Sequence, residues 1–352
     1  MSDSSTLSRV FPKARWETAP PEKVGMDPEK VAQVGRWFVE ASGENKGRLV
    51  IVRGGRVVLE IYHRMSADEK PGIASAAKSI YSNVLGILVQ EGGLKSPDER
   101  VVDDYPEMMD VKEGQGNKPG RYAFPVNRGI TFRHLICNVS GYMKPGEAPG
   151  KVFNYQSWGM NVLTHALAKI YGLYDVGDPE GLPGFKALIK SKLADKIGAN
   201  WEYKYSNPEY NDRLIKGARL DIFGYYTQVH STALDLARVG WLWCNWGKWE
   251  DRQIVPEAWL RETSVVAPDI LANCPQEEWM YGHGIWTNAE GILWPDLPRE
   301  AFGASGAGGH DWTVFPGKEL VVVQNPGKYQ AAAPGVISNP ELLKMVLEAC
   351  ES

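Results

Sequence analysis

The chain has few cysteines and no long apolar run. Its four cysteines, Cys137, Cys244, Cys274 and Cys350, lie far apart without a C-x-x-C pair, so we expect neither a disulfide framework nor a zinc site. No stretch approaches the roughly 18 consecutive apolar residues of a membrane-spanning helix. Residues 1–15 are polar and Ser-rich and lack the apolar core of a secretory signal. We therefore expect a cytoplasmic protein that binds no membrane.

Clustered charge of one sign is also missing. The 39 Lys and Arg residues against 43 Asp and Glu give a net charge of -4, and no basic run stands out, which argues against a nucleic-acid partner. Metal and cofactor sites are not expected, since the six histidines show no ligand spacing: His63, His134, His165, His230, His283 and His310. The absence of G-x-S-x-G excludes the nucleophile elbow of α/β-hydrolases. A small ester or amide molecule remains the expected partner.

Regular patterns occupy most of the chain, whose 352 residues are 43% hydrophobic and suffice for a large core. Strand patterns occur at 49–53, 57–62, 282–287, 310–315 and 320–324, and helical patterns at 28–41, 131–137, 159–171, 185–197, 232–246, 256–263 and 340–350. Strands at both ends with helices between them predict a discontinuous α/β domain of residues 20–75 and 228–352. Residues 76–227 would form a mainly helical domain inserted between these parts.

The most informative motif is Ser75-Ala76-Ala77-Lys78, the single Ser-x-x-Lys of the sequence. Residues three apart share a helix face, so Lys78 can reach the Ser75 hydroxyl and take its proton. The small residues before Ser75 and the apolar positions after it predict the first turn of a buried helix, where backbone N–H groups favour a developing negative charge. The alternative is an N-cap serine followed by a surface lysine.

A serine–lysine catalyst also needs a second proton carrier and an oxyanion hole. Tyr155-Gln156-Ser157 precedes an apolar helix, and a tyrosine beside a lysine ammonium is expected to favour its phenolate. The glycine-rich residues 303–309 precede a strand, and there the Ala307 N–H can pair with the Ser75 N–H around an oxyanion. A tight turn into the strand is the alternative interpretation of these glycines.

Two further tyrosines stand in literal Tyr-Ser-Asn tripeptides. Tyr81-Ser82-Asn83 lies within the helix of Ser75, where helical geometry turns it to another face, so we interpret it as structural. Tyr205-Ser206-Asn207 has no apolar helix behind it, unlike Tyr155. The context favours Tyr155, and Tyr205 stays open as the other candidate for the catalytic tyrosine.

Taken in order, Ser75-Ala76-Ala77-Lys78, Tyr155-Gln156-Ser157 and Ala304-Ser305-Gly306 resemble the three motifs of the serine β-lactamase-related hydrolases. This superfamily contains class C β-lactamases, DD-peptidases, family VIII carboxylesterases and 6-aminohexanoate-dimer hydrolases. Residues 130–141 and 231–240 are similar to further segments of the same superfamily. The resemblance implies a β-lactamase/transpeptidase-like α/β (α+β) fold, an antiparallel sheet with flanking helices, and a site in the cleft between this domain and the helical one.

The resemblance also implies roles for individual residues. Ser75 would be the nucleophile, Lys78 its base and Tyr155 the acid and base, with the Ser75 and Ala307 amides as the oxyanion hole. Substrate contacts would come from the remaining motif positions and their neighbours: Ser157, Ser305, Gly306 and His310. The motif-flanking tryptophans, Trp158, Trp286 and Trp312, either line an apolar pocket or belong to the core.

One departure from the motifs bears on the substrate. Ala304 stands where the third motif commonly has lysine or histidine, a cation that holds the carboxylate of a β-lactam or peptide terminus. Its absence favours a carboxylesterase acting on small or medium acyl esters. The open alternatives are an amidase or peptidase of the aminohexanoate-oligomer or D-amino-acid type, a weak β-lactamase, and a penicilloyl-binding sensor or non-catalytic scaffold with the same fold.

Overall fold

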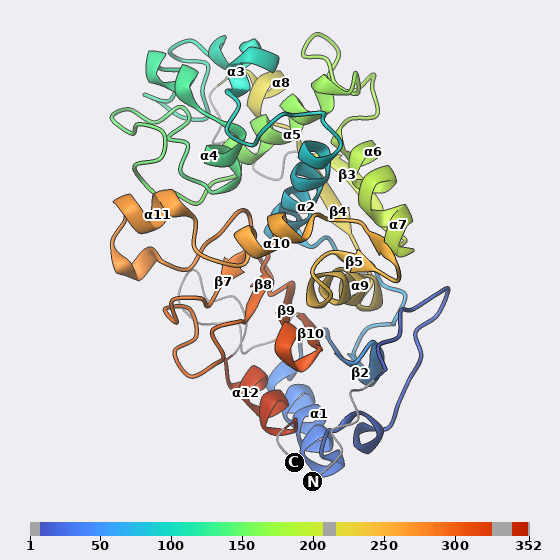
Figure 1. Ribbon diagram of the computed structural model, residues 1–352. Helices are drawn as coiled ribbons and strands as arrows, with labels where there is room; N and C mark the ends of the chain where they lie inside the picture. Colours follow the sequence, from blue (N-terminus) through green and yellow to red (C-terminus); the bar gives the residue numbers. More distant parts are fainter. Residues whose placement is uncertain (1–7, 207–215, 326–339, 351–352) are drawn as a thin grey trace.

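The computed structural model describes residues 8–206, 216–325 and 340–350 (Figure 1). Six antiparallel strands form its main sheet in the order β2-β1-β10-β9-β8-β7. Their bounds are β1 Gly47–Arg53, β2 Arg56–His63, β7 Trp286–Thr287, β8 Phe302–Ala304, β9 Asp311–Phe315 and β10 Leu320–Asn325. The sheet thus joins strands from both ends of the chain, as the sequence pattern predicts.

Strands β1 and β10 are neighbours in the sheet and consist mainly of buried residues, and a tight turn joins β1 to β2. Every residue of β10 is buried, as are six of the seven in β1, so both faces of the sheet are covered. β1 pairs with β10 in a register that places Val50 opposite Val323. Gly54 and Gly55 join β1 to β2 with φ of +57° and +82°, as a two-residue hairpin turn requires. The predicted hairpin is confirmed.

Helices pack against the sheet, and one of these contacts requires a glycine. Helix α1 (Pro28–Ser42), capped by Asp27, packs against β1, β2 and α12 (Pro340–Glu348). Helix α9 (Ala233–Cys244), capped by Thr232, packs against β1, β9 and β10. A Cβ at Gly240 of α9 would lie 2.3 Å from a methyl group of Val321, so glycine is needed for this contact. Helices α1 and α12 lie side by side at one end of the molecule (Figure 1).

A group of mainly short helices lies on the far side of α2 from α1 and α12 (Figure 1). It comprises α3 Val101–Asp104, α4 Phe132–Ile136, α5 Trp158–Ile170, α6 Phe185–Leu188, a π-helical stretch Ile189–Ala194, α7 Asp195–Ile197 and α8 Leu220–Phe223. The smaller remaining elements are the hairpins β3 Glu202–Ser206 with β4 Tyr226–His230 and β5 Lys248–Trp249 with β6 Arg252–Gln253, and the helices α10 Glu257–Thr263 and α11 Pro268–Asn273. The domain limits drawn from the sequence stay a prediction.

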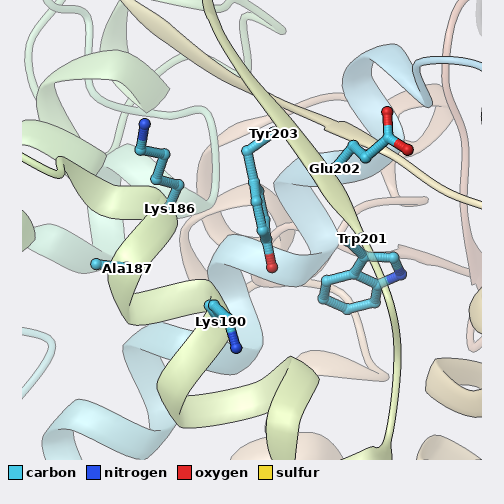
Figure 2. A pocket seen from close by; sticks show the side chains of 6 residues that line it. All are labelled: Lys186, Ala187, Lys190, Trp201, Glu202 and Tyr203. Atoms are coloured by element: carbon cyan, nitrogen blue, oxygen red, sulfur yellow. The ribbon is translucent and has the colours of Figure 1, made fainter.

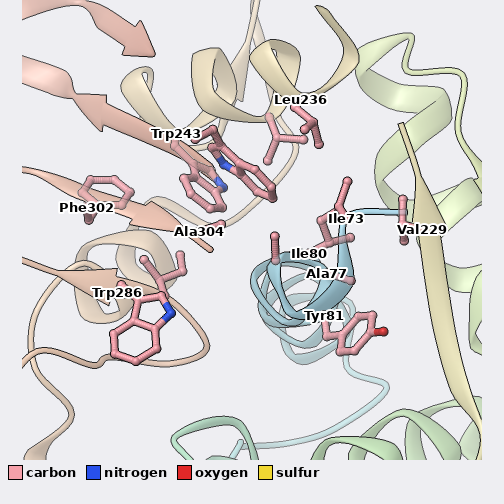
Figure 3. Packing of buried hydrophobic residues seen from close by; sticks show 14 of the residues in the cluster. Ile73, Ala77, Ile80, Tyr81, Val229, Leu236, Trp243, Trp286, Phe302 and Ala304 are labelled. Carbon is pink, nitrogen blue, oxygen red and sulfur yellow. The ribbon is translucent and has the colours of Figure 1, made fainter. Parts of the chain in front are cut away.

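Helix α2 (Ala77–Gln90) runs through the middle of the molecule. Twelve of its 14 residues are buried, so it is enclosed on all sides. Its polar residues bond to other elements: Ser79 Oγ donates to the Gly284 carbonyl at 2.6 Å, and Asn83 Oδ1 accepts from Trp243 Nε1 at 3.2 Å. Figure 3 shows Ile80 of this helix facing the buried side chains of α9 and β8. The residues at the start of α2 are therefore firmly placed.

Candidate active site

Ser75 lies in a short 3-10 turn, Ala74–Ala76, directly before α2. Ala74 has φ of +48°, a left-handed conformation that is strained for alanine. Two contacts with strand β4 hold it: the Tyr226 hydroxyl donates to the Ala74 carbonyl, and the Ile73 N–H donates to the Val229 carbonyl at 2.9 Å. The Ser75 hydroxyl is thus presented by a strained 3-10 turn at the start of α2, close to the first helical turn predicted from the sequence and unlike the alternative of an N-cap serine.

Lys78 lies one helical turn after Ser75 and is only 1% exposed. Its Nζ donates a hydrogen bond to Ser75 Oγ at 2.8 Å. The same Nζ lies over the aromatic ring of Tyr155, 4.6 Å from the ring centroid. The structure therefore brings Ser75, Lys78 and Tyr155 together, although 77 residues of sequence separate Lys78 from Tyr155.

The electrostatics of Tyr155 differ from our expectation of a favoured phenolate. The residue is 36% exposed, yet burial of its hydroxyl end raises its pKa to about 12, and a hydrogen bond with Ser75 only partly offsets this effect. Burial disfavours the charged form, and the Lys78 amine contacts the ring face. The phenolate prediction was wrong: Tyr155 is a neutral phenol at neutral pH.

The third motif packs directly on the turn of Ser75. A Cβ at Gly306 would lie 2.0 Å from the Ile73 carbonyl oxygen and 3.0 Å from the Ala76 nitrogen, so glycine is needed there. Ala307 follows at an exposed position. Within the described ranges, the N–H groups of Ser75 and Ala307 donate to no other backbone or side-chain group. Two donors without acceptors, on segments in contact, are what an oxyanion hole requires.

A comparison with known proteins places this arrangement in a family. A family model named Beta-lactamase matches residues 38–324, which include Ser75, Lys78, Tyr155 and the third motif. The chain belongs to the β-lactamase family. No curated protein sequence matches the chain. The predicted fold class is confirmed, and membership supports assignment as a hydrolase.

Several solved structures share this fold at low sequence identity. A putative β-lactamase from Bacteroides dorei DSM 17855 is 16% identical, with a TM-score of 0.64 over 93% of this chain and 100% of that one. A putative 6-aminohexanoate-dimer hydrolase from Bacillus anthracis is 16% identical, with a TM-score of 0.60 over 98% and 89%. EstCE1, described as a hydrolase with promiscuous acyltransferase activity, is 14% identical, with a TM-score of 0.61 over 92% and 98%.

The third motif of this β-lactamase-family protein presents no exposed cation. Ala304 is fully buried, and its neighbour Ser305 lies half-buried near the Asp311 carboxyl, whose pKa it lowers against the effect of burial. His310 is 8% exposed and bonds to the Asn325 amide. Burial, assisted by the charge of buried Arg48, lowers the pKa of His310 to about 4, so His310 is neutral at neutral pH. Neither Ala304 nor His310 therefore contributes a charge to this part of the site.

An aromatic wall stands beside Tyr155. The Trp286 ring lies 5.4 Å from the Tyr155 ring between centroids, tilted by 31°, and Tyr281 meets Tyr155 edge-on at 5.8 Å. Phe153 completes the group by packing against Tyr281 at 5.3 Å. Trp286 is therefore the motif-flanking tryptophan that the structure places at the site.

The other two tryptophans belong to the core, which corrects their interpretation as pocket residues. Trp158 opens α5 and packs edge-on against Phe223 of α8, with 5.3 Å between centroids. Trp312 is fully buried and lies 5.5 Å from Trp243, because its face of β9 is covered by α9. Both side chains are therefore buried among core residues.

The two alternative tyrosines have partners away from Ser75. The Tyr81 hydroxyl donates to the Thr227 carbonyl at 2.6 Å and is fully buried, a structural role as expected. The Tyr205 hydroxyl lies 3.3 Å from His165 Nε2, and its ring stacks on Tyr225. Asn207 of that tripeptide lies outside the described residues. Ser157, half-buried before α5, makes no cap hydrogen bond there.

A separate open pocket of about 500 Å³ lies where α6 and the π-helical stretch meet the start of β3 (Figure 2). It is lined by Lys186, Ala187, Lys190, Trp201, Glu202 and Tyr203. Lys190 donates to Asp195 at 2.5 Å, and Glu202 lies 3.4 Å from Lys70, so two of the three charged residues that line it are already paired. Across the part of the chain that the structure describes, no cluster of three potential metal ligands occurs, and no helix has the length and apolarity to cross a membrane.

Proposed function

We propose that the protein is a carboxylesterase that hydrolyses small or medium acyl esters through an acyl-enzyme on Ser75. The observation that carries the proposal is the pair of side chains that surround Ser75 Oγ. Ser75 Oγ accepts a hydrogen bond from the Lys78 amine at 2.8 Å, the same amine lies 4.6 Å from the Tyr155 ring centroid, and Ser75 acts on the pKa of the Tyr155 phenol, so a proton acceptor and a proton donor meet at the same nucleophile.

Acylation begins when Lys78, in its neutral form, takes the Ser75 hydroxyl proton as the oxygen attacks the ester carbonyl carbon. A bond forms between Ser75 Oγ and that carbon, and the carbonyl electrons move to the oxygen, which the Ser75 and Ala307 N–H groups receive. When the tetrahedral intermediate collapses, the bond to the alcohol oxygen breaks. Tyr155, protonated with a pKa of about 12, gives its proton to the departing alkoxide.

Deacylation reverses the direction of proton transfer. The Tyr155 phenolate left by acylation accepts a proton from water as the water oxygen attacks the acyl carbon. The bond to Ser75 Oγ then breaks, and the proton held by Lys78 returns to this oxygen 2.8 Å away. The products are a carboxylic acid and an alcohol, and the three side chains regain their starting protonation.

The neutral third motif supports an ester as substrate. A β-lactam or a peptide terminus carries a carboxylate, which a buried Ala304 and a neutral His310 do not pair with. A neutral ester needs only the two N–H donors and an apolar surface, which Trp286 and Tyr155 can supply.

Turnover assays on purified protein test the proposal. p-Nitrophenyl acetate and butyrate would be compared with a p-nitroanilide of the same acyl group and with nitrocefin, using Ser75→Ala as the control. We expect steady ester turnover that Ser75→Ala abolishes. Faster anilide turnover would favour the amidase. An acyl group that accumulates on Ser75 by mass spectrometry without turnover would favour the sensor, and no acylation at all would favour the scaffold.

A further inference from the structure

Asn138 lies just beyond α4 and has an unusual backbone conformation. Its φ is +58°, in the left-handed region that asparagine tolerates better than most residues do. It is only 2% exposed, so its amide must find partners inside the protein. Those partners surround Tyr155.

Two of the partners are the chain neighbours of Tyr155. The Asn138 carbonyl accepts a hydrogen bond from the Asn154 N–H at 2.8 Å, and Asn138 Oδ1 accepts one from the Gln156 N–H at 3.1 Å. The backbone is thereby fixed directly before and directly after Tyr155. A single residue holds both sides of the segment, which otherwise belongs to a long irregular stretch ahead of α5.

The third partner acts on the Tyr155 ring. Asn138 Nδ2 donates to the Tyr281 hydroxyl at 3.2 Å, and Tyr281 is fully buried. The Tyr281 ring meets Tyr155 edge-on, with 5.8 Å between centroids and 90° between planes. Asn138 therefore orients the side chain that Tyr155 rests against.

We propose that Asn138 is a positioning residue for Tyr155, holding the phenol hydroxyl on Ser75 Oγ for proton transfer; this rests on the proposed function. Proton transfer needs the donor and acceptor oxygens within about 3.2 Å, and a displacement of about 1 Å can cost a hundredfold in rate. Three hydrogen bonds from one buried residue to both flanks and to the ring support limit such displacement.

The variant Asn138→Gly separates the effect of the Asn138 side-chain hydrogen bonds from the effect of its backbone hydrogen bond. Glycine keeps the positive φ and the carbonyl bond to Asn154 but loses both amide bonds. We expect kcat for p-nitrophenyl butyrate to fall about 10- to 100-fold, with KM changed less than about threefold, the range for lost orientation of a reacting group. Asn138→Asp keeps an acceptor for the Gln156 N–H and offers Tyr281 an acceptor, so it should recover part of kcat.

A matched control is Asn127, a fully buried asparagine of the same stretch. Its Oδ1 accepts from the backbone N–H of Phe124 at 3.0 Å and of Met143 at 3.3 Å, away from the neighbours of Tyr155. Asn127→Ala should lower the melting temperature, as Asn138→Gly does, while kcat of the folded fraction stays within about twofold. An equal loss of kcat in both variants would overturn the proposal.

A double-mutant cycle with Tyr155→Phe gives the decisive test. If Asn138 acts through the Tyr155 hydroxyl, Asn138→Gly should change kcat less than about twofold once that hydroxyl is removed. Equal fold losses in both backgrounds would show a merely structural role. If Tyr155→Phe alone has no effect, the proposed role of Tyr155 fails, a result distinct from failure of the Asn138 proposal.

Should Asn138→Gly fail to fold, Tyr281→Phe provides the same cycle. It keeps the ring against Tyr155 and removes only the hydroxyl that Asn138 Nδ2 contacts. We expect a two- to fivefold loss of kcat in the Tyr155 protein and none in the Tyr155→Phe background. A loss that persists in both backgrounds would overturn the proposal.

Discussion

The amine of Lys78 lies over the ring of Tyr155, 4.6 Å from its centroid, while it donates to Ser75 Oγ. Once Lys78 has taken the proton of Ser75, its ammonium is attracted by the aromatic face at about 0.5–2 kcal/mol. This attraction needs the ring but not the hydroxyl. The two functions of Tyr155, its contact with Lys78 and its proton, can therefore be separated by removing one oxygen atom.

Tyr155→Phe is expected to lower kcat for p-nitrophenyl esters by about two to four orders of magnitude, the range for a general acid and base. The ring remains, so Lys78 should keep its place and the melting temperature should change little. Tyr205→Phe and Tyr81→Phe, whose hydroxyls contact His165 and the Thr227 carbonyl, should keep kcat within about threefold. A larger loss with Tyr205→Phe would transfer the role to that residue.

Ser75→Ala should abolish ester hydrolysis and leave the melting temperature within a few degrees of wild type. The Ser75 hydroxyl makes no cap hydrogen bond to the backbone of its turn, so alanine removes the nucleophile without removing a cap. Ser79→Ala is the matched control, because that buried hydroxyl donates to the Gly284 carbonyl and not to Ser75, Lys78 or Tyr155. It should cost roughly 1 kcal/mol of stability and retain turnover. Hydrolysis by pure Ser75→Ala would refute the acyl-enzyme.

Neutral esters should be turned over with kcat/KM at least one to two orders of magnitude above that for nitrocefin or penicillin G. An unpaired carboxylate forgoes a charge-assisted hydrogen bond of about 1.5–3 kcal/mol, and about 1.4 kcal/mol corresponds to a factor of ten. Matched progress curves on both substrate classes provide the measurement. The substitution Ala304→Lys is not expected to restore β-lactam turnover. The Ala304 methyl group is fully buried, so a lysine charge at this position would destabilise the fold. Efficient β-lactam turnover by wild type would contradict this prediction.

Gly306→Ala should lower kcat/KM at least tenfold. The added methyl group would stand 2.0 Å from the Ile73 carbonyl oxygen, so the loop carrying the Ala307 N–H must move away from Ser75. Loss of one oxyanion donor typically costs 10²- to 10³-fold in kcat. Gly129→Ala is the control, since its Cβ would meet no heavy atom within 4 Å. Full activity in Gly306→Ala would place the oxyanion hole elsewhere.

Stability is expected to fall as pH drops below about 6.5, because of buried histidines. Burial lowers the pKa of His165 and His310 to about 4 and that of His283 to about 3, from 6.5 in the unfolded chain. Between these values the unfolded chain binds protons that the folded protein does not, so stability present above pH 6.5 is lost as pH falls. Each histidine contributes about 1.4 kcal/mol per pH unit.

A histidine variant isolates this contribution. His283 accepts a hydrogen bond from Arg133 at 2.7 Å, and His283→Gln keeps an acceptor there without the titrating group. The difference in melting temperature between wild type and this variant should shift in favour of the variant as pH falls from 7 to 5. Burial also raises the pKa of Asp311, so this carboxyl makes the folded protein more stable as pH falls. Its effect is the same in wild type and in His283→Gln, and it therefore cancels when their melting temperatures are subtracted. A difference independent of pH would contradict the assignment.

Elements with a strong local pattern were predictable from the sequence. The apolar run of β1 and the glycine pair after it define a hairpin, and the periodic residues of α5 define a helix close to its observed bounds. Strand β8 was missed, because Phe302-Gly303-Ala304 is short and carries two small residues with little strand preference. The antiparallel pair of β3 and β4 was missed because the surrounding residues suggested a helical domain.

At the site, the order of the motifs pointed to Ser75, Lys78 and Tyr155. The protonation state of Tyr155 and the hydrogen bonds that hold these residues could not be predicted, because they depend on contacts between distant segments. The protonated state of Tyr155 follows from burial and from where Lys78 meets the ring, which no motif encodes. The hydrogen bond from Tyr226 to the strained Ala74 and the bonds of Asn138 join distant segments. The local signal available was asparagine itself, the residue that best accepts a left-handed conformation after a short helix.

The pairing of β1 with β10 has a consequence for how the protein is made. Arg48 and Asn325 stand opposite each other in the sheet but lie 277 residues apart along the chain. During synthesis, the segment bearing Ser75 leaves the ribosome before the glycine-rich loop and its flanking strands. The entropy cost of closing so long a loop must be met before the sheet contacts can form. The nascent chain therefore carries Ser75 without the glycine-rich loop that packs on its turn, and the site can assemble only after the chain has been translated past Asn325.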